Sequence, residues 1–357
     1  MNLRFIDLRF FYKVSMCFLE QDDKNIFIVG EEQMKIVVAD TDSVGSDMDY
    51  TLFDELGECT YYDDKITDDN AAERLADAKV LMINKSAISD KILDAAPDLE
   101  LICEFATGFD NANIEACNRH GVKVANVVGY STMSVAQHTF SLLFYLMENS
   151  RHYDEFVKSG KYANQSHFCC LDIPFNELDG KTYGIVGMGN IGRKVAEIAT
   201  AFGAKVIFYS ASGKSTCTDY ERVEFDELLS RSDVISLHCP LTDRTRNLFD
   251  KNAFDKMKKN AILINVARGA VVSEQDLYYA LTEGKIAAAG LDVLNPEPMA
   301  KDSPLLKIQD SGKLFVTPHM AWASTEARKR CLEEVKENVV AWQKGQMRNI
   351  VTLETDS

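Results

Sequence analysis

The sequence lacks the features that mark membrane-spanning, secreted and nucleic-acid-binding proteins. No run of about eighteen apolar residues occurs in its 357 residues, so we expect no membrane span. Residues 1–33 carry Arg4, Arg9 and Lys13 but no uninterrupted apolar core of signal-peptide length, so we do not expect secretion. Basic residues are in deficit, 39 against 55 acidic ones, and the net charge of −16 opposes binding to nucleic acid or to an anionic membrane.

The nine cysteines show neither CxxC pairs nor zinc-ligand spacing, so the sequence predicts no metal site. Several of them lie in apolar segments. An odd number of scattered thiols indicates a reducing cytoplasm, where disulfides are rare. Because 46% of the residues are hydrophobic, a chain of this length can build two sizeable cores, and we expect a cytoplasmic protein of two domains.

The most informative motif that is present is GMGNIG at 187–192. It joins a predicted buried strand at 181–186 to a predicted helix at 190–202 with one apolar face. In such a turn the first glycine allows the tight bend, the second lets the backbone approach a pyrophosphate, and the third lets helix and strand pack closely. The N–H groups at the helix start then bind the anion. The predicted dinucleotide site therefore includes Gly187, Met188, Gly189, Asn190, Ile191 and Gly192.

The next predicted strand, at 205–210, departs from the pattern of NAD-selective folds. Such folds usually end this strand in Asp or Glu, about twenty residues past the glycines, to hold the ribose hydroxyls. Here the segment reads Tyr209-Ser210-Ala211-Ser212-Gly213-Lys214, without a carboxylate that would repel a 2′-phosphate. Ser210, Ser212 and Lys214 either contact such a phosphate or form a polar surface turn, so NAD and NADP both remain open.

Three later residues fit the chemistry of hydride transfer to a carbonyl: Arg268, Glu297 and His319. Negative charge builds on the ketone oxygen, so a proton donor with a pKa near neutral is needed, and unperturbed imidazole has a pKa of about 6.5. A carboxylate such as Glu297 near His319 favours imidazolium and fixes its tautomer. The planar fork of Arg268 matches a carboxylate, and this arginine follows a predicted strand at 261–266, at the end of the sheet where ligands bind.

Each of these three residues also has a structural interpretation when it is considered alone. Arg268 is then a surface arginine, Glu297 a solvated loop acid and His319 a core histidine. Their occurrence together, in this order after the glycine loop, favours the catalytic hypothesis. The remaining histidines lack such a context and are interpreted as structural: His120, His138, His152, His167 and His238.

Five motifs in this order resemble the D-isomer-specific 2-hydroxyacid dehydrogenases, over nearly the whole chain from Met34: GMGNIG, HCPLTDRTRNLF, INVARG, GLDVLNPEP and TPHMAWAS. The resemblance implies an α/β fold of two Rossmann-like, doubly wound parallel-sheet domains with the active site in the cleft between them. It implies an oxidoreductase that interconverts 2-keto acids and D-2-hydroxy acids with NAD or NADP. Within it, Arg268 would bind the substrate's carboxylate and carbonyl, Glu297 would pair with His319, and His319 would be the acid–base.

The resemblance implies further contacts. Asp292 would meet the nicotinamide carboxamide, and the cofactor would also be lined by Cys239, Pro240, Thr245, Val266, Ala267 and His319. In the first domain the segments 84–86 and 106–109 match loops that bind the substrate carboxylate, so the substrate candidates there are Lys85, Thr107 and Gly108. Trp322 resembles the HxAWAS form of many glycerate dehydrogenases; it either caps a small substrate pocket or packs between the domains.

The order of the predicted elements gives discontinuous domains: an extension at 1–33, a substrate domain at 34–133 and 320–357, and a dinucleotide-binding domain at 134–319. The first domain is expected to contain strands in MKIVVAD, KVLMIN, LELICEF and 122–127, with a helix near 48–57. Strands of the second are predicted at 183–186, 205–209, 234–237, 261–265, 287–291 and 314–316, before a last helix at 323–344. Ser134 and Gln137 are predicted to form a capping box for a long apolar helix, which in the family packs against a second subunit of a homodimer.

The substrate implied by the HMAWAS segment is small, namely hydroxypyruvate or glyoxylate, giving D-glycerate or glycolate. Two other classes of function stay open: a nicotinamide-sensing corepressor-like binding protein, and a dehydrogenase of formate or phosphite. The corepressor-like proteins share the two-domain architecture of the dehydrogenases but bind partners instead of turning over a substrate. Residues 1–33 depart from the family pattern, and we expect them to be an upstream-start extension.

Overall fold

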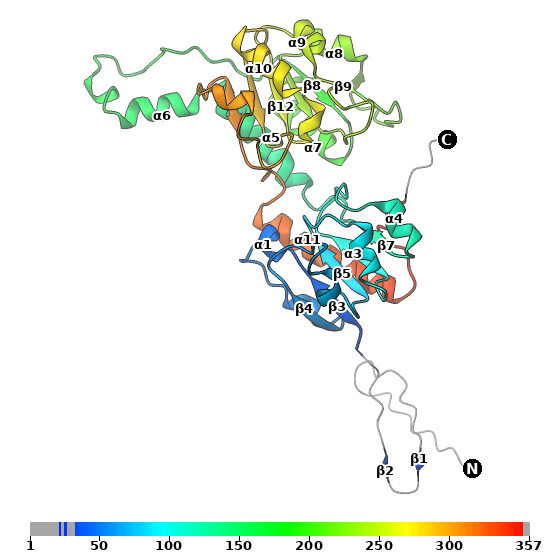
Figure 1. Ribbon diagram of the computed structural model, residues 1–357. Helices are drawn as coiled ribbons and strands as arrows, with labels where there is room; N and C mark the ends of the chain where they lie inside the picture. Colours follow the sequence, from blue (N-terminus) through cyan, green and yellow to red (C-terminus); the bar gives the residue numbers. More distant parts are fainter. Residues whose placement is uncertain (1–20, 23–24, 27–32, 353–357) are drawn as a thin grey trace. The chain divides into compact units, whose positions relative to one another are not determined.

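Two parallel β-sheets form from the runs of apolar residues in the chain (Figure 1). The computed structural model describes residues 21–22, 25–26 and 33–352. The chain divides into a first unit, which ends at Val127 and resumes at Glu333, and a second unit of Val128–Leu332. Each unit contains one of the two parallel sheets, so the expected fold of two Rossmann-like α/β domains is confirmed.

The first unit has a five-stranded parallel sheet in the order β4-β3-β5-β6-β7. Its strands are β3 (Lys35–Val38), β4 (Glu58–Tyr61), β5 (Val80–Ile83), β6 (Leu101–Glu104) and β7 (Lys123–Ala125). Short helices connect them: α1 (Thr41–Val44), η1 (Thr51–Phe53), α2 (Ala71–Arg74), α3 (Asp90–Asp94) and α4 (Ile114–Arg119). Every residue of β5 and β6 is buried, as in parallel strands that are covered on both faces.

The second unit has a seven-stranded parallel sheet in the order β10-β9-β8-β11-β12-β13-β14. The strands are β8 (Thr182–Val186), β9 (Lys205–Tyr209), β10 (Glu221–Arg222), β11 (Val234–Leu237), β12 (Ile262–Asn265), β13 (Ala288–Leu291) and β14 (Leu314–Val316). Six of these strands were predicted from apolar runs. The observed ends differ from the predicted ones by at most one residue.

Helices cover both faces of the seven-stranded sheet. One core contains α5 (Thr132–Met147) and α7 (Asn190–Ala201). The other contains α8 (Phe225–Arg231), α9 (Lys251–Lys256) and α10 (Glu274–Thr282). The remaining elements are α6 (Ser150–Lys158), α11 (Thr325–Gln343) and the 3₁₀ turns η2 (Tyr162–Asn164), η3 (Gly269–Val271) and η4 (Pro304–Lys307).

The predicted helix near 48–57 is wrong, because only the single 3₁₀ turn η1 forms there. The Asp49 carboxylate accepts hydrogen bonds from the Thr51 amide at 3.0 Å and from its hydroxyl at 2.6 Å. A side chain that binds the backbone two residues ahead offers an alternative to helical hydrogen bonding. The turn is sufficient to bury the side chains of Phe53 and Leu56, so a full helix is not needed there.

The capping box predicted for Ser134 and Gln137 is also wrong. Helix α5 begins at Thr132, so Ser134 lies inside the first turn. Its hydroxyl donates to the carbonyl of Ala321 at 2.6 Å instead of to a neighbouring amide. A tertiary partner has replaced the local one.

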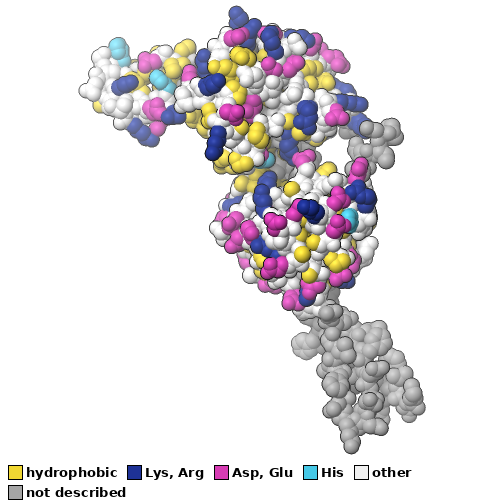
Figure 2. All heavy atoms as spheres, in the orientation of Figure 1, with side chains coloured by type: hydrophobic (Ala, Val, Ile, Leu, Met, Phe, Trp, Pro, Cys, Tyr) yellow, Lys and Arg dark blue, Asp and Glu magenta, His cyan; other side chains and the backbone are white. Residues whose placement is uncertain are grey.

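Figure 2 shows acidic and basic side chains interspersed over the visible face of both units. Among the described residues, none of the helices combines the length and the apolar character needed to cross a membrane. The expectation for residues 1–33 falls mostly outside the described part of the chain; within it, β1 (Gln21–Asp22) and β2 (Asn25–Ile26) form an antiparallel pair.

Candidate active site

The predicted site residues of the second unit all follow the carboxyl ends of strands in the seven-stranded sheet. These ends share one edge of a parallel sheet, which is where ligands bind in open α/β folds. In sheet order, Ser210 and Lys214 follow β9, the glycine loop follows β8, Cys239, Pro240 and Thr245 follow β11, Val266, Ala267 and Arg268 follow β12, Asp292 and Glu297 follow β13, and His319 and Trp322 follow β14. The fold therefore gathers residues that are far apart in sequence.

The glycine loop has the geometry that a dinucleotide requires. Gly187 has φ +95°, and a Cβ there would lie 2.8 Å from the Cys239 amide nitrogen. A Cβ at Gly192 would lie 2.1 Å from the carbonyl oxygen of Gly187, so only glycine lets α7 pack this closely. Gly189 differs, because a Cβ there would meet no protein atom within 4 Å. It would project into the open space before the first turn of α7, where a pyrophosphate fits the helix N–H groups.

The loop after β9 places cationic groups beside the predicted ribose site. Ser210 is buried at the end of the strand. Arg222 lies on the neighbouring β10, and its guanidinium donates to the Gly213 carbonyl at 3.1 Å. The Lys214 amide donates to the Ser212 hydroxyl at 3.2 Å, which completes the turn. The segment from Ser210 to Thr218 contains Lys214 and no carboxylate. Asp219 follows it and lies 4.0 Å from the Arg193 guanidinium.

The loop after β11 is fixed by one buried hydroxyl. The Thr245 hydroxyl donates to the Pro240 carbonyl at 2.7 Å and accepts from the Thr242 amide at 2.8 Å.

Two titratable residues at the start of this loop are shifted by burial. Burial raises the pKa of the Cys239 thiol to about 11 and lowers the pKa of His238 to about 3. His238 is therefore neutral, which agrees with its interpretation as a structural residue.

Asn265 shapes the turn that carries Arg268, and the sequence analysis did not single it out. Its side chain is fully buried, accepts a hydrogen bond from the Ala267 amide at 3.0 Å and donates to the Arg268 carbonyl at 3.0 Å. The Arg268 guanidinium donates to the Ala267 carbonyl at 2.9 Å. An Asn at the end of an apolar strand is the signal that would have found it, because such a side chain satisfies a turn.

The Arg268 turn lies directly against the loop that carries Glu297. A Cβ at Gly269 would lie 1.9 Å from the Leu294 carbonyl oxygen and 2.7 Å from the Asn295 nitrogen. Glu274 of α10 supports the same loop by accepting from the Asn295 amide at 2.8 Å and from the Ser303 hydroxyl at 3.1 Å. The predicted guanidinium and carboxylate therefore come from adjoining backbone segments.

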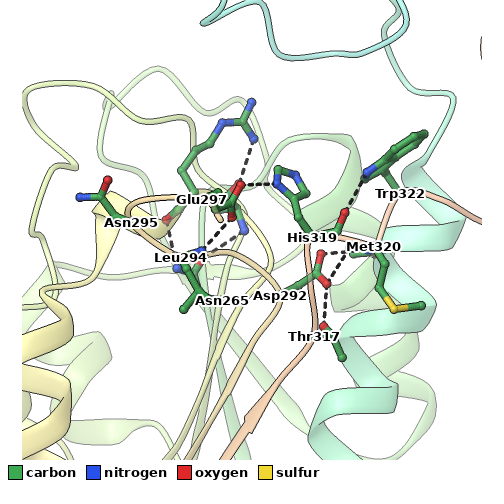
Figure 3. Close-up of polar contacts among 12 residues, drawn as sticks. Asn265, Asp292, Leu294, Asn295, Glu297, Thr317, His319, Met320 and Trp322 are labelled. Atoms are coloured by element: carbon green, nitrogen blue, oxygen red, sulfur yellow. Dashed lines mark hydrogen bonds and ion pairs between the residues drawn. The ribbon is translucent and has the colours of Figure 1, made fainter. Parts of the chain in front are cut away.

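Glu297 and His319 form the predicted pair (Figure 3). Glu297 Oε2 lies 2.7 Å from His319 Nδ1, and Oε1 accepts from the Leu294 amide at 2.8 Å. Both side chains are about one-third exposed, at 36% for Glu297 and 30% for His319. The imidazole is thus oriented by its carboxylate while its ring still reaches solvent.

A buried carboxylate, Asp292, organises the backbone around His319 (Figure 3). Asp292 is 1% exposed, and its oxygens accept from the Thr317 hydroxyl at 2.6 Å and from the amides of Met320 and Ala321 at 2.9 and 2.8 Å. Burial alone would raise the pKa of Asp292, but His138, Thr317 and the two amides outweigh it and hold the pKa below its ordinary value. Asp292 is therefore a charged anchor of this loop, and its predicted contact with the nicotinamide stays a prediction.

Trp322 is fixed to the same loop. Its indole N–H donates to the His319 carbonyl at 3.0 Å, and its ring meets Tyr130 edge-on at 6.5 Å. In the first unit the substrate candidates also follow strand ends: Lys85 follows β5, and Thr107 and Gly108 follow β6. The Thr107 hydroxyl donates to the Val127 carbonyl at 2.6 Å.

A glycine cradle for a pyrophosphate and an imidazole paired with a carboxylate, on one edge of a parallel sheet, define a nicotinamide-dependent oxidoreductase. Comparison with known proteins makes the class more specific. The family model described as "D-isomer specific 2-hydroxyacid dehydrogenase, NAD binding domain" matches residues 140–321. The chain belongs to the D-isomer-specific 2-hydroxyacid dehydrogenase family.

Two curated relatives cover most of the chain. A hydroxypyruvate reductase of Blautia hydrogenotrophica is 38% identical over 324 residues, covering 89% of this chain and 99% of the relative. A glycerate dehydrogenase of Methylorubrum extorquens is 37% identical over 317 residues, covering 89% and 98%. These similarities show an NAD(P)-linked oxidoreductase of 2-hydroxy and 2-keto acids that acts on the CH–OH group, and they do not favour the corepressor-like, formate or phosphite alternatives.

Solved structures show the same fold. An acyclic imino acid reductase in complex with NADPH and D-Arg has a TM-score of 0.80 and 29% identity, covering 89% of this chain and all of that chain. A D-lactate dehydrogenase from Aquifex aeolicus, complexed with NAD and lactic acid, has a TM-score of 0.74 and 28% identity, covering 87% and 96%. The cofactor of this chain is NAD or NADP.

Proposed function

We propose that this protein reduces hydroxypyruvate and glyoxylate to D-glycerate and glycolate, with Arg268, Glu297 and His319 as its catalytic residues. The observation that carries the proposal is the 2.7 Å contact between His319 Nδ1 and Glu297 Oε2, next to the Arg268 turn. The names of the relatives support the substrate: besides the hydroxypyruvate reductase and the glycerate dehydrogenase, a glyoxylate reductase of Thermococcus litoralis is 38% identical over 278 residues.

The bound nicotinamide supplies or accepts the hydride at C2 of the substrate. Because Nδ1 of His319 is occupied by Glu297, Nε2 is the ring nitrogen that gives a proton to the carbonyl oxygen in reduction and removes it in oxidation. The Glu297 carboxylate stabilises the imidazolium that donates this proton. Arg268 binds the substrate carboxylate through two parallel hydrogen bonds and so orients the carbonyl.

The position of Trp322 supports a small substrate. Its indole is fixed at one end by the His319 carbonyl and on one side by Tyr130, so the ring does not swing away to admit a bulky side chain. Lys85, Thr107 and Gly108 of the first unit are proposed to contact the substrate carboxylate as well. Gly108 suits a close approach of backbone to ligand.

The loop after β9 supports NADPH as the preferred cofactor. Arg222 and Lys214 supply positive charge, and the segment from Ser210 to Thr218 contains no carboxylate that would repel a 2′-phosphate. The imino acid reductase with a similar fold was solved with NADPH.

A homodimer is also proposed, and the segment from α6 to Phe175 supports it. None of the residues of α6 is buried, and large apolar side chains of this segment are exposed: Val157, Tyr162, Phe168, Leu171 and Phe175. Phe168 and Leu171 are 89% and 78% exposed, which a second copy would cover. Light scattering of the purified protein measures this directly, and a monomer would contradict it. No disulfide links the eight cysteines of the described residues, which supports a reducing cytoplasm that cell fractionation tests.

The substrate is tested by steady-state kinetics with glyoxylate, hydroxypyruvate, pyruvate, 2-ketoisocaproate and phenylpyruvate, each with NADH and NADPH. We expect kcat/KM to be highest for hydroxypyruvate and glyoxylate. The decrease should be graded for added methylenes, about 1–3 kcal/mol each, and much steeper for the aromatic ring, which overpacks the pocket. A maximum at phenylpyruvate or 2-ketoisocaproate would contradict the proposed substrate and leave the family assignment intact.

A further inference from the structure

We propose that His138 and Ser134 of α5 are positioning residues that hold the His319 loop in the conformation needed for proton transfer. This inference rests on the proposed role of His319. Both residues lie on α5, which packs against β12, β13 and β14, and not on a loop that follows a strand. From this helix their side chains contact the His319 loop.

The His319 loop needs external support because of its backbone. His319 has φ +53°, in the left-handed region that L residues other than glycine seldom adopt. Its amide donates to the Asp292 carbonyl at 2.7 Å, and the next two amides, of Met320 and Ala321, donate to the Asp292 carboxylate. The chain therefore wraps around Asp292, and the conformation of His319 depends on where that carboxylate is held.

His138 holds that carboxylate. Its Nε2 lies 2.9 Å from the Thr317 hydroxyl and 3.4 Å from Asp292 Oδ1. The single proton of the Thr317 hydroxyl goes to Asp292 Oδ1 at 2.6 Å, so the hydroxyl oxygen accepts from His138. Nε2 of His138 must then carry a proton, and hydrogen bonds run in one direction from His138 through Thr317 to Asp292.

Ser134 holds the other side of the loop. It precedes His138 by one helical turn and lies on the same face of α5. Its hydroxyl donates to the Ala321 carbonyl at 2.6 Å and accepts from the Ser324 amide at 3.4 Å. The two side chains thus fix the loop before His319, at Thr317, and after it, at Ala321.

The helix itself is a rigid support. Ala136, Leu142 and Leu143 of α5 are fully buried in the core that it shares with α7. Small displacements of a catalytic group are costly: a shift of about 1 Å can lower the rate about a hundredfold. Loss of either support should therefore affect the chemical step more than the binding of either ligand.

The experiment compares His138→Leu, His138→Gln and Ser134→Ala with wild type, and Gln137→Leu serves as the matched control on the exposed side of the same helix. We expect kcat for keto-acid reduction to fall about ten- to a hundredfold in His138→Leu, with KM and the Kd for NADPH, measured by nicotinamide fluorescence, changed less than about threefold. The solvent deuterium isotope effect on kcat should rise, because proton transfer becomes slower. His138→Gln, whose amide N–H replaces Nε2–H, should recover most of the activity.

Ser134→Ala should change kcat and the isotope effect in the same direction, and Gln137→Leu should change neither. If His138→Leu does not fold, Thr317→Val interrupts the same hydrogen-bond chain without a change of shape and decides the question. Wild-type kcat and isotope effect in the folded variants would overturn the inference. His319→Ala separates the two proposals: if it retains activity the proposed catalytic role fails, and if it is inactive while the α5 variants are normal only the positioning role fails.

Discussion

At the scale of single residues, the proposed function depends on the contacts that orient each proposed catalytic side chain. Glu297 uses one oxygen for His319 and the other for the Leu294 amide, so its carboxylate plane is fixed. Arg268 lies on a turn that the Asn265 side chain stabilises through hydrogen bonds to the Ala267 amide and the Arg268 carbonyl. These contacts are local to the strand ends, and substitutions that keep charge but alter shape should reveal them.

Arg268→Lys is the sharpest such substitution. Lysine keeps the positive charge but loses the planar fork, so we expect KM for the keto acid to rise and kcat to fall, with kcat/KM lower by about tenfold or more. Steady-state kinetics with glyoxylate measure both constants. Arg119→Lys, an exposed arginine on α4 that pairs with Asp90, is the control. Kinetics equal to wild type would reduce Arg268 to a surface residue.

At the scale of elements, the sequence predicted the strands well and the local ends of helices less well. Every residue of the apolar runs 234–237 and 288–291 is buried, as in parallel strands that are covered on both faces. A continuous apolar run in the sequence therefore predicts such a strand directly. The 48–57 segment has apolar residues at helical spacing, but Asp49 diverts the backbone into a turn. Ser134 was misassigned because its partner, Ala321, is 187 residues away, and no local pattern contains that contact.

The candidate site divides in the same way. The positions of the glycine loop, Arg268, Glu297 and His319 after strands could be predicted, because each follows an apolar run in the sequence. Their roles in binding and catalysis stay predictions. Asn265 and the orientation of His138 were not, because their role depends on turns and helices that come together only in the folded chain.

The loop between β9 and β10 carries a prediction about the cofactor. Arg222→Ala and Lys214→Ala should each weaken NADPH binding about tenfold, the usual effect of losing a hydrogen bond to a charged group, and leave NADH binding nearly unchanged. Titrations monitored by nicotinamide fluorescence give both Kd values. Lys205→Ala removes an exposed cation at the other end of β9 and should alter neither. Equal losses for the two cofactors would mean that these side chains do not discriminate between them.

At the scale of the whole molecule, one buried acid should make stability depend on pH. Glu104 ends β6 in the first unit, and burial raises its pKa to about 8 from an ordinary 4.5. The Asn111 amide, a donor at 3.3 Å, and Lys85 lower the pKa, whereas Asp40 and Asp110 raise it. One of its oxygens, Oε1, has no hydrogen-bond partner among the described residues. The folded chain therefore holds a proton on Glu104 at neutral pH that the unfolded chain has lost.

The sign of the effect follows from this difference in bound protons. Stability is fully present below about pH 4.5, where both states are protonated, and decreases as the pH rises towards 8. Glu104→Gln removes the titration, so we expect it to unfold at a higher temperature than wild type at pH 8.5 and at nearly the same temperature at pH 5. The difference in the free energy of unfolding should be on the order of a few kcal/mol. Glu115→Gln on α4 is the exposed control, and identical pH slopes for Glu104→Gln and wild type would contradict the prediction.

The contact at Gly269 has a mechanical consequence. Main chain meets main chain there, with no side chain between the arginine turn and the Leu294 carbonyl. A side chain can change rotamer and absorb a displacement, but two backbones in contact transmit it. We therefore expect the arginine turn and the loop of Glu297 to move together. The spacing between the guanidinium that is proposed to bind substrate and the carboxylate that pairs with His319 should then stay constant when the core beneath them repacks.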